Sequence, residues 1–293
     1  MIPIRPRRSA LYMPGSNARA IEKAKTLATD VVIFDLEDAV APDLKIQARE
    51  QVCAAVQAGG YGRRELVIRI NALETPWGEA DLAAAVAAAP DAILVPKVSS
   101  AETLAAVGLR LRKLGAAERT RIWAMIETPL AILRAESIAS AAHDVDTRLT
   151  CFVMGTNDLA KDTRARLLPG RAAMLPWLMT ALAAARAHGI DILDGVYNSL
   201  SDAEGFRAEC GQGRDCGFDG KTLIHPDQIA AANEIFAPSA QEIENARAVA
   251  AAFAQPENAG KGAISLNGRM VERLHAEMAR RTLALAEAIA RAT

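Results

Sequence analysis

The chain has 293 residues, of which 51% are hydrophobic and 4% aromatic, with 34 Lys and Arg against 35 Asp and Glu. A chain of this length buries enough apolar surface to fold without disulfides, and this composition is too apolar for a disordered protein. A net charge of −1 leaves no basic excess for nucleic acid, and no apolar run reaches the roughly 18 residues of a membrane helix. The sequence therefore predicts a compact cytoplasmic protein without nucleic-acid or membrane partners.

Eight short apolar runs alternate with segments whose apolar residues recur every three or four positions. The runs predict strands at Ser9–Met13, Val31–Leu36, Leu66–Ile70, Ala92–Val95, Ile122–Ile126, Cys151–Met154, Ile190–Val196 and Thr222–Ile224. The intervening segments predict helices at Ala18–Ala28, Lys45–Ala58, Trp77–Ala89, Ala101–Leu114, Leu130–Ala142, Ala172–His188 and Ser201–Glu209. Such alternation is typical of parallel βα units, and eight units favour a closed (β/α)8 TIM barrel over an open doubly wound sheet.

The pattern changes after Pro226. Helices are predicted over Asp227–Phe236, Pro238–Ala254 and Met270–Ala292, with a loop over Gln255–Arg269 that is rich in Gly and Asn. We therefore predict a barrel over residues 1–230 and a C-terminal helical extension over residues 231–293.

Polar side chains follow nearly every predicted strand at its C-terminal end, where parallel barrels place catalytic groups. They include Asp35, Glu37, Asp38, Arg69, Asn71, Lys97, Glu127, Asp158, Asp194 and His225. Converging carboxylates repel one another, and a hard divalent cation with oxygen ligands such as Mg²⁺ relieves that repulsion. Glu127 and Asp158 end neighbouring strands, so we predict them as the Mg²⁺ ligands.

Several of these residues also have a purely structural interpretation. Glu127 and Asp158 stand where helix-capping residues occur, and Arg69 fits a salt bridge between layers. Lys97 fits a solvated strand end, and His225 fits a cap at the start of a helix. The shared position at the same end of the strands favours a functional site.

Several longer motifs resemble the HpcH/HpaI aldolase and citrate lyase β-subunit family. They lie at Arg8–Ser16, Phe34–Asp43, Val67–Asn71, Met125–Thr128, Met154–Leu159, Gly220–Pro226 and Ala263–Met270. The resemblance implies a TIM barrel, Mg²⁺ and a homo-oligomer, a trimer or hexamer. It also implies a carbon–carbon lyase that cleaves a 3-hydroxyacyl-CoA such as malyl-CoA or citramalyl-CoA to acetyl-CoA and a 2-keto acid, or the reverse.

The resemblance also implies roles for individual residues. Glu127 and Asp158 would hold the metal, and Arg69 would bind the keto-acid carboxylate and the developing oxyanion. Glu37 and Asp38 would hold the waters of the metal. The substrate site would further include Lys97 and Gly155, and the CoA end would include Pro14, Gly15, Lys221 and His225.

One position departs from the family pattern. Relatives usually carry Ser-Leu-Asp-Gly-x-Met near the C-terminus, and that Asp reaches a neighbouring subunit's site, which would make the extension part of oligomer contacts and active-site closure. This chain has Asn267 at the corresponding catalytic position, and an amide is not a general base. Glu37 or Asp38 is then the nearest candidate base. Two alternatives are a citrate lyase β-subunit acting on a citryl-acyl carrier protein, and a catalytically impaired protein that binds a keto acid or a CoA ester.

Overall fold

The computed structural model describes residues 4–292 and contains a closed barrel of eight parallel strands in sequence order. The strands are β1 Ser9–Pro14, β2 Val31–Asp35, β3 Glu65–Arg69, β4 Ala92–Val95, β5 Arg121–Ile126, β6 Leu149–Met154, β7 Asp191–Asp194 and β8 Gly220–Leu223. Pairing of β8 with β1 closes the sheet. The predicted TIM barrel is therefore confirmed.

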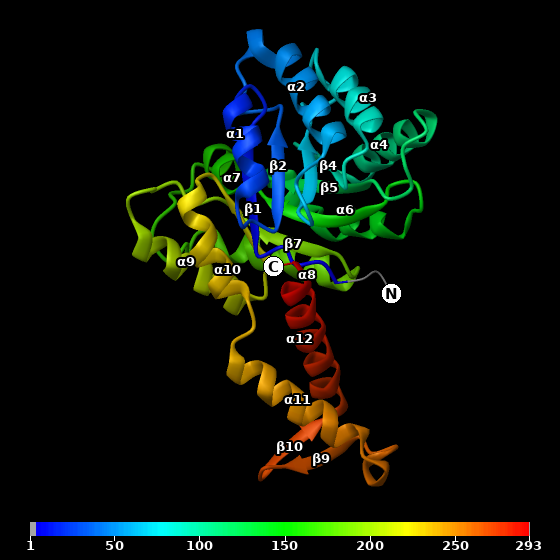
Figure 1. The fold of residues 1–293 in the computed structure, drawn as a ribbon, viewed down its shortest axis with the longest axis vertical. Helices are drawn as coiled ribbons and strands as arrows, with labels where there is room; N and C mark the ends of the chain where they lie inside the picture. Colours follow the sequence, from blue (N-terminus) through cyan, green and yellow to red (C-terminus); the bar gives the residue numbers. More distant parts are fainter. Residues whose placement is uncertain (1–3, 293) are drawn as a thin grey trace. The chain divides into compact units, whose positions relative to one another are not determined.

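Helices surround the barrel (Figure 1). They are α1 Ala18–Lys23, α2 Lys45–Ala58, α3 Gly78–Ala88, α4 Ala101–Lys113, α5 Pro129–Leu133, α6 Ala135–Ser140, α7 Thr156–Thr163, α8 Leu175–Ala187 and α9 Ala203–Cys216. The single helix predicted over Leu130–Ala142 is wrong, because Arg134 leaves helical geometry and separates α5 from α6. Helix α7 is short and polar and was not predicted.

The barrel interior is filled by apolar side chains from the inward faces of the strands. This core contains Ala10, Val31, Ile33, Val67, Ala92, Leu94, Trp123, Met125, Cys151, Val153 and Leu193. Side chains along a strand alternate between its two faces, so the inward series continues at every second residue toward the C-terminal ends. This phase determines which polar residues reach the mouth of the barrel.

The C-terminal part contains α10 Ile229–Phe236, α11 Ala240–Ala254, β9 Ala263–Leu266, β10 Arg269–Glu272 and α12 Arg273–Ala292. Helices α11 and α12 lie side by side (Figure 1), and the strands pair as an antiparallel hairpin. The loop predicted over Gln255–Arg269 is therefore wrong in its second half, and Met270 is in a strand rather than a helix. The Asn267-Gly268 pair supplies the two-residue turn that favours a hairpin.

The described residues divide into two compact units, residues 7–233 and residues 4–6 with 234–292. This division falls inside α10. No helix within residues 4–292 has the length and apolar composition needed to cross a bilayer.

Candidate active site

The polar site is the last inward-facing layer of the barrel, at the C-terminal ends of the strands. Ile33 belongs to the interior core, so Asp35, two positions further along β2, also faces inward. Arg69 of β3 is the register partner of Asp35, and both side chains are nearly fully buried. Glu127 follows the end of β5 in the same inward phase and is also fully buried. The barrel thus places these three charged groups at its mouth.

Arg69 ties the carboxylates that follow β2 to the barrel interior. Its Nε and Nη2 donate to the two oxygens of Asp35 over 2.7 and 2.6 Å. Its Nη1 lies 2.7 Å from Oε2 of Glu37 and 3.5 Å from Oδ2 of Asp38. The guanidinium carbon lies 4.8 Å from the centroid of the Tyr12 ring. The structure therefore brings Arg69 together with Glu37 and Asp38, and it holds the guanidinium in one orientation.

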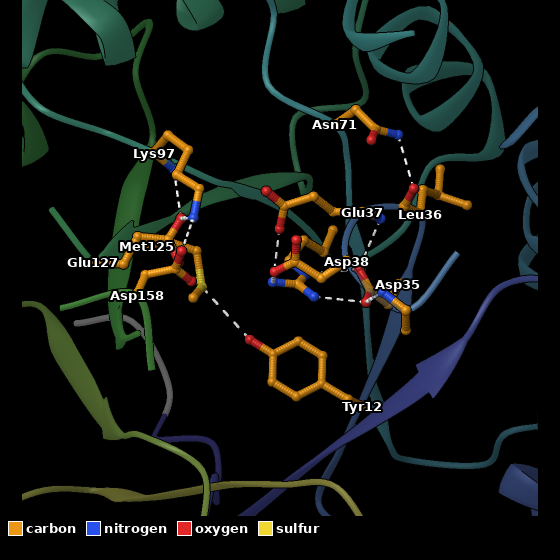
Figure 2. A network of polar contacts seen from close by, with 12 residues as sticks. Tyr12, Asp35, Leu36, Glu37, Asp38, Asn71, Lys97, Met125, Glu127 and Asp158 are labelled. Atoms are coloured by element: carbon orange, nitrogen blue, oxygen red, sulfur yellow. Dashed lines mark hydrogen bonds and ion pairs between the residues drawn. The ribbon is translucent and has the colours of Figure 1, made fainter. Parts of the chain in front are cut away.

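Lys97, Glu127 and Asp158 form a second group at the barrel mouth (Figure 2). Nζ of Lys97 lies 2.6 Å from Oδ1 of Asp158 and 3.4 Å from Oε1 of Glu127. Thr128 caps α5, so Glu127 is not a helix cap. Asp158 lies in the first turn of α7 without capping it, since Gly155 is the N-cap residue there. The two predicted metal ligands therefore converge on one ammonium group.

Glycines at the ends of β6 and β7 leave room for this group. A Cβ atom on Gly155 would lie 2.3 Å from Cβ and 2.6 Å from Oε2 of Glu127. A Cβ atom on Gly195 would lie 2.5 Å from Oγ1 of Thr156, at the start of α7. Any larger residue at either position would therefore displace the segments that present Glu127 and Asp158.

Two residues that the sequence analysis did not single out support the site. Nζ of Lys45 donates to the backbone oxygens of Leu36 and Glu37 over 2.8 and 2.6 Å and to Oδ1 of Asn71 over 2.8 Å. This buried ammonium fixes the loop that carries Glu37. Tyr12 lies beneath Arg69 and donates toward the sulfur of Met125. The inward phase of β1 indicates Tyr12, whereas no sequence signal separates Lys45 from an ordinary helix residue.

Negative charge is in excess at the barrel mouth. Among the described residues, five carboxylates (those of Asp35, Glu37, Asp38, Glu127 and Asp158) share ion pairs with two cations, Arg69 and Lys97, and the ammonium of Lys45 adds a third positive charge nearby. Burial raises the pKa of Glu37 to about 8, and nearby carboxylates add to this effect while Arg69 opposes it. Burial also raises the pKa of Glu127, although Lys97 opposes the increase. The site therefore favours an additional positive charge.

The donor set fits Mg²⁺. Oε2 of Glu127 is buried and has no hydrogen-bond partner among the described residues. Such an orphaned carboxylate oxygen is costly without a cation. No three His, Cys, Asp or Glu side chains within residues 4–292 form a complete metal cage. Mg²⁺ usually takes only one or two carboxylates together with waters and substrate oxygens, so Glu127 and Asp158 suffice.

The residues expected at the CoA end differ in their surroundings. Pro14 ends β1, and the backbone nitrogen of Gly15 donates to the oxygen of Asp35 over 2.8 Å. His225 caps the short helical turn Pro226–Gln228, as its structural interpretation predicts. For Pro14, Gly15 and His225, a role at the CoA end stays a prediction.

Lys221 lies in a buried ion-pair cluster between the sheet and the helix layer. Its side chain is fully buried, and its Nζ lies 2.9 Å from Oδ2 of Asp194 and 2.7 Å from Oε1 of Glu209 on α9. Leu193 faces inward, so Asp194 and its register partner Lys221 face the helix layer instead. Lys221 thus faces the helix layer rather than the barrel interior, and its expected role at the CoA end stays a prediction.

Asn267 lies in the C-terminal unit, at the first position of the β9–β10 turn. Its φ of +51° and the φ of +75° at Gly268 are typical of a two-residue hairpin turn. Asn tolerates this left-handed region better than most residues. Its geometry thus accounts for Asn at this position, and its catalytic role stays a prediction.

The chain is similar to several known proteins over nearly its whole length. The chain is 53% identical over 285 residues to a (3S)-malyl-CoA thioesterase from Cereibacter sphaeroides (strain KD131), covering 97% of this chain and 96% of the relative. It is 36% identical to the citrate lyase subunit beta of Escherichia coli (strain K12), covering 97% and 94%. The crystal structure of CitE from Mycobacterium tuberculosis with magnesium, acetoacetate and coenzyme A is 29% identical, with a TM-score of 0.74 over 95% of this chain and 97% of that one.

The barrel also matches a family model as a whole. The match to the HpcH/HpaI aldolase/citrate lyase model spans residues 8–226, which includes every charged residue of the barrel mouth. On the strength of this match, the barrel topology and the arrangement of its acidic mouth, the chain belongs to the HpcH/HpaI aldolase/citrate lyase family.

Proposed function

We propose that this protein is a Mg²⁺-dependent enzyme that acts on the CoA thioester of a short 3-hydroxy dicarboxylic acid such as malyl-CoA. The observation that carries the proposal is the acidic mouth of the barrel, where Glu127 and Asp158 converge beside the oriented guanidinium of Arg69. The relatives named above are a malyl-CoA thioesterase and a protein that binds magnesium and coenzyme A, and both names support this substrate class.

Glu127 and Asp158 are the proposed holders of the metal. When bound, Mg²⁺ would act as a Lewis acid toward a substrate oxygen. The orphaned Oε2 of Glu127 and the space left by Gly155 support this assignment. Both carboxylates are anchored on the barrel, so they present their oxygens without a large rearrangement.

Arg69 is the proposed binding group for a substrate carboxylate. Asp35 holds Nε and Nη2, which leaves the Nη1 edge toward Glu37 and Asp38. The pair with Asp38 is long, at 3.5 Å, and the Asp38 side chain is exposed. A substrate carboxylate can replace Asp38 there and gain charge-assisted hydrogen bonds from a guanidinium that is already oriented.

Asn267 favours hydrolysis of the thioester over cleavage of a carbon–carbon bond. Hydrolysis adds water to the thioester carbonyl and breaks the C–S bond, which gives malate and the free thiol of CoA. Carbon–carbon cleavage instead needs a base for the hydroxyl proton of the substrate, and the family's Asp at this position is an amide here. The 53% identical relative is named as a thioesterase, which supports the same choice. Glu37, buried beside Arg69, is the proposed base toward water.

The second candidate function is the lyase reaction, which yields a 2-keto acid and an acetyl thioester, either acetyl-CoA or the acetyl-carrier protein according to the substrate. The 36% identity to a citrate lyase subunit beta over nearly the whole chain supports it, on a CoA thioester or on a citryl group carried by an acyl carrier protein. In either reaction, a homo-oligomer, a cytoplasmic location and a CoA end near Pro14, Gly15 and His225 belong to the proposal. Light scattering after size-exclusion chromatography tests the oligomer, for which a trimer or hexamer is expected.

The deciding experiment identifies products. The purified full chain is incubated with malyl-, methylmalyl-, citramalyl- and citryl-CoA, with Mg²⁺ or with chelator, and products are identified by mass spectrometry. Mg²⁺-dependent release of malate and CoA from malyl-CoA is expected. Acetyl-CoA with glyoxylate would establish the lyase instead. Turnover of none of them, with the keto acid still bound, would favour a binding protein.

A single substitution separates the two reactions. Asn267→Asp restores the family's carboxylate at a turn position that Asp also tolerates, so the fold should be kept. If Asn267 limits carbon–carbon cleavage, this variant should form acetyl-CoA and glyoxylate from malyl-CoA where the wild type forms malate. An unchanged product ratio would show that residue 267 does not select the bond.

A further inference from the structure

We propose that Lys97 is an internal counter-ion for the metal ligands, whose ammonium occupies the metal position in the metal-free protein and must leave when Mg²⁺ binds. The inference rests on the metal-binding role of Glu127 and Asp158 proposed above. Lys97 would compete with Mg²⁺ for the two carboxylates and thereby lower the affinity of the site for the metal. Figure 2 shows the Lys97 side chain directed at both carboxylates.

The contacts of the ammonium are those of a cation in a carboxylate site. Nζ lies 2.6 Å from Oδ1 of Asp158 and 3.4 Å from Oε1 of Glu127, on the two residues expected to hold the metal. The Glu127 side chain is fully buried, whereas that of Asp158 is 23% exposed. A buried carboxylate without a positive neighbour is strongly disfavoured. Lys97 supplies that neighbour when no metal is present, and a divalent ion at the same carboxylates would repel it.

The backbone of Lys97 holds Glu127 independently of the ammonium. Lys97 has a φ of +53°, a left-handed conformation that is uncommon for residues other than glycine. In this conformation its backbone nitrogen donates to Oε1 of Glu127 over 2.7 Å. The carboxylate therefore keeps one fixed contact when the side chain moves away. Removal of the ammonium by mutation should leave Glu127 in place.

The Lys97 side chain also reaches solvent, which gives the ammonium space to leave the two carboxylates. The Lys97 side chain is 37% exposed, and a lysine has a flexible four-carbon stem that carries a compact charge. Once displaced, it stays within reach of the barrel mouth, where an anionic substrate is its next partner. Metal binding would thus release a cation for the substrate, which places the metal before the substrate in the order of binding.

The test measures Mg²⁺ binding to the full chain by isothermal titration calorimetry, without substrate. Lys97→Met keeps the stem and the backbone contact but removes the competing charge. It should bind Mg²⁺ roughly two- to fivefold more tightly than the wild type, the factor expected for a partly exposed ion pair. Lys161→Met is the matched control, because Lys161 is an exposed lysine on the same helix as Asp158. The control should bind Mg²⁺ with wild-type affinity.

Two further measurements keep the inference open to contradiction. Lys97→Arg retains the charge and adds a two-pronged donor, so it should bind Mg²⁺ more weakly than the wild type. In thermal unfolding, Mg²⁺ should raise the midpoint of Lys97→Met more than that of the wild type. Equal or weaker Mg²⁺ binding by Lys97→Met would overturn the counter-ion role, and so would wild-type binding by Lys97→Arg. Absence of Mg²⁺ binding in both the wild type and Lys97→Met would instead overturn the metal assignment itself.

Discussion

The two ends of the barrel contain similar charged side chains in different states of pairing. At the N-terminal end of the strands, Nε and Nη2 of Arg7 each donate to a Glu65 oxygen over 2.7 Å, and Nη1 donates to Asp191 over 2.6 Å. The guanidinium carbon lies 4.7 Å from the centroid of the Trp123 ring. Arg8 pairs in the same two-pronged way with Asp30.

At the C-terminal end, the pairing is incomplete. Five carboxylates share ion pairs with Arg69 and Lys97 there, against three with Arg7 and Arg8 at the N-terminal end, and one oxygen of Glu127 is buried without a hydrogen-bond partner among the described residues. Burial at the N-terminal end is similarly deep, so burial does not distinguish the two ends. A satisfied cluster stabilises the fold, whereas an unsatisfied cluster retains an excess negative charge that a bound cation would neutralise. The comparison predicts that substitutions at the C-terminal end reduce activity and Mg²⁺ binding, whereas substitutions at the N-terminal end reduce stability.

The largest expected effect is the loss of activity in Glu127→Gln. The amide keeps an oxygen for the backbone nitrogen of Lys97 but removes the charge that holds the metal. Turnover should fall by about 10³-fold or more, and Mg²⁺ binding should be lost in calorimetry. The midpoint of thermal unfolding should stay level or rise, because a buried charge with an orphaned oxygen has been removed.

Glu118→Gln is the control for this prediction. Glu118 is exposed and lies just before β5, at the other end of the strand that Glu127 follows. It should behave as the wild type in both assays. Retained Mg²⁺ affinity in Glu127→Gln would show that Glu127 does not hold the metal. A large loss of stability would show that Glu127 stabilises the fold, as the ion pairs at the N-terminal end do.

The next effect is a loss of stability at the N-terminal end. Arg7→Met leaves the carboxylates of Glu65 and Asp191 without the guanidinium that bridges them. Breaking a buried ion pair on one side typically costs about 3 to 5 kcal/mol. We expect a fall of about 3 kcal/mol in the free energy of unfolding measured with urea, together with unchanged Mg²⁺ affinity in the folded protein.

Arg63→Met, an exposed arginine two residues before β3, controls for the loss of a positive charge. It should change the free energy of unfolding little. A change of similar size in both variants would mean that net charge, rather than the pairing at this end, determines stability. A loss of Mg²⁺ affinity in Arg7→Met alone would mean that the two ends are coupled through the barrel interior.

The barrel was predictable because its strands are buried on both faces. They form continuous apolar runs, and all eight were found with small errors at their ends. Helix α2 agrees with its prediction over Lys45–Ala58. The β9–β10 hairpin was missed although its Asn-Gly turn is a recognised signal, since its strands are short and half exposed. Short elements offer too few residues for a period to be recognised.

The position of the charged residues was predictable, but their partners were not. Strand ends indicated Arg69, Glu127 and Asp158, because parallel strands share one end. Sequence does not show which way a side chain faces at the end of a short strand, so the burial of Lys221 against the helix layer was not predicted. It also does not show that Lys45 turns back to hold the loop at Glu37. Such contacts join residues whose proximity is set by the closed barrel.

The cluster around Lys221 provides the smallest and sharpest test of the comparison. Asp194 lies at the C-terminal end of β7, yet it is fully paired with Lys221 and with Arg171, whose Nη1 lies 2.7 Å from its Oδ1. If pairing decides the outcome rather than position along the strand, Asp194→Asn should lower stability by about 2 kcal/mol near neutral pH. It should leave Mg²⁺ affinity unchanged. Asp215→Asn, at an exposed site near the end of α9, is the control.

The stability difference between the wild type and Asp194→Asn should depend on pH in a direction set by the pKa of Asp194. Burial alone would raise the pKa of Asp194, but Lys221 and Arg171 hold it below its usual value. A depressed pKa contributes stability above the unfolded-state pKa of about 4, and that contribution is lost as the pH falls through the folded-state pKa. The difference between wild type and variant should therefore be full at pH 7 and shrink under acid in urea titrations. A difference that stays constant on acidification would show that Lys221 and Arg171 do not stabilise the charge of the Asp194 carboxylate. A loss of Mg²⁺ affinity in Asp194→Asn would show that the C-terminal end of β7 contributes to the metal site.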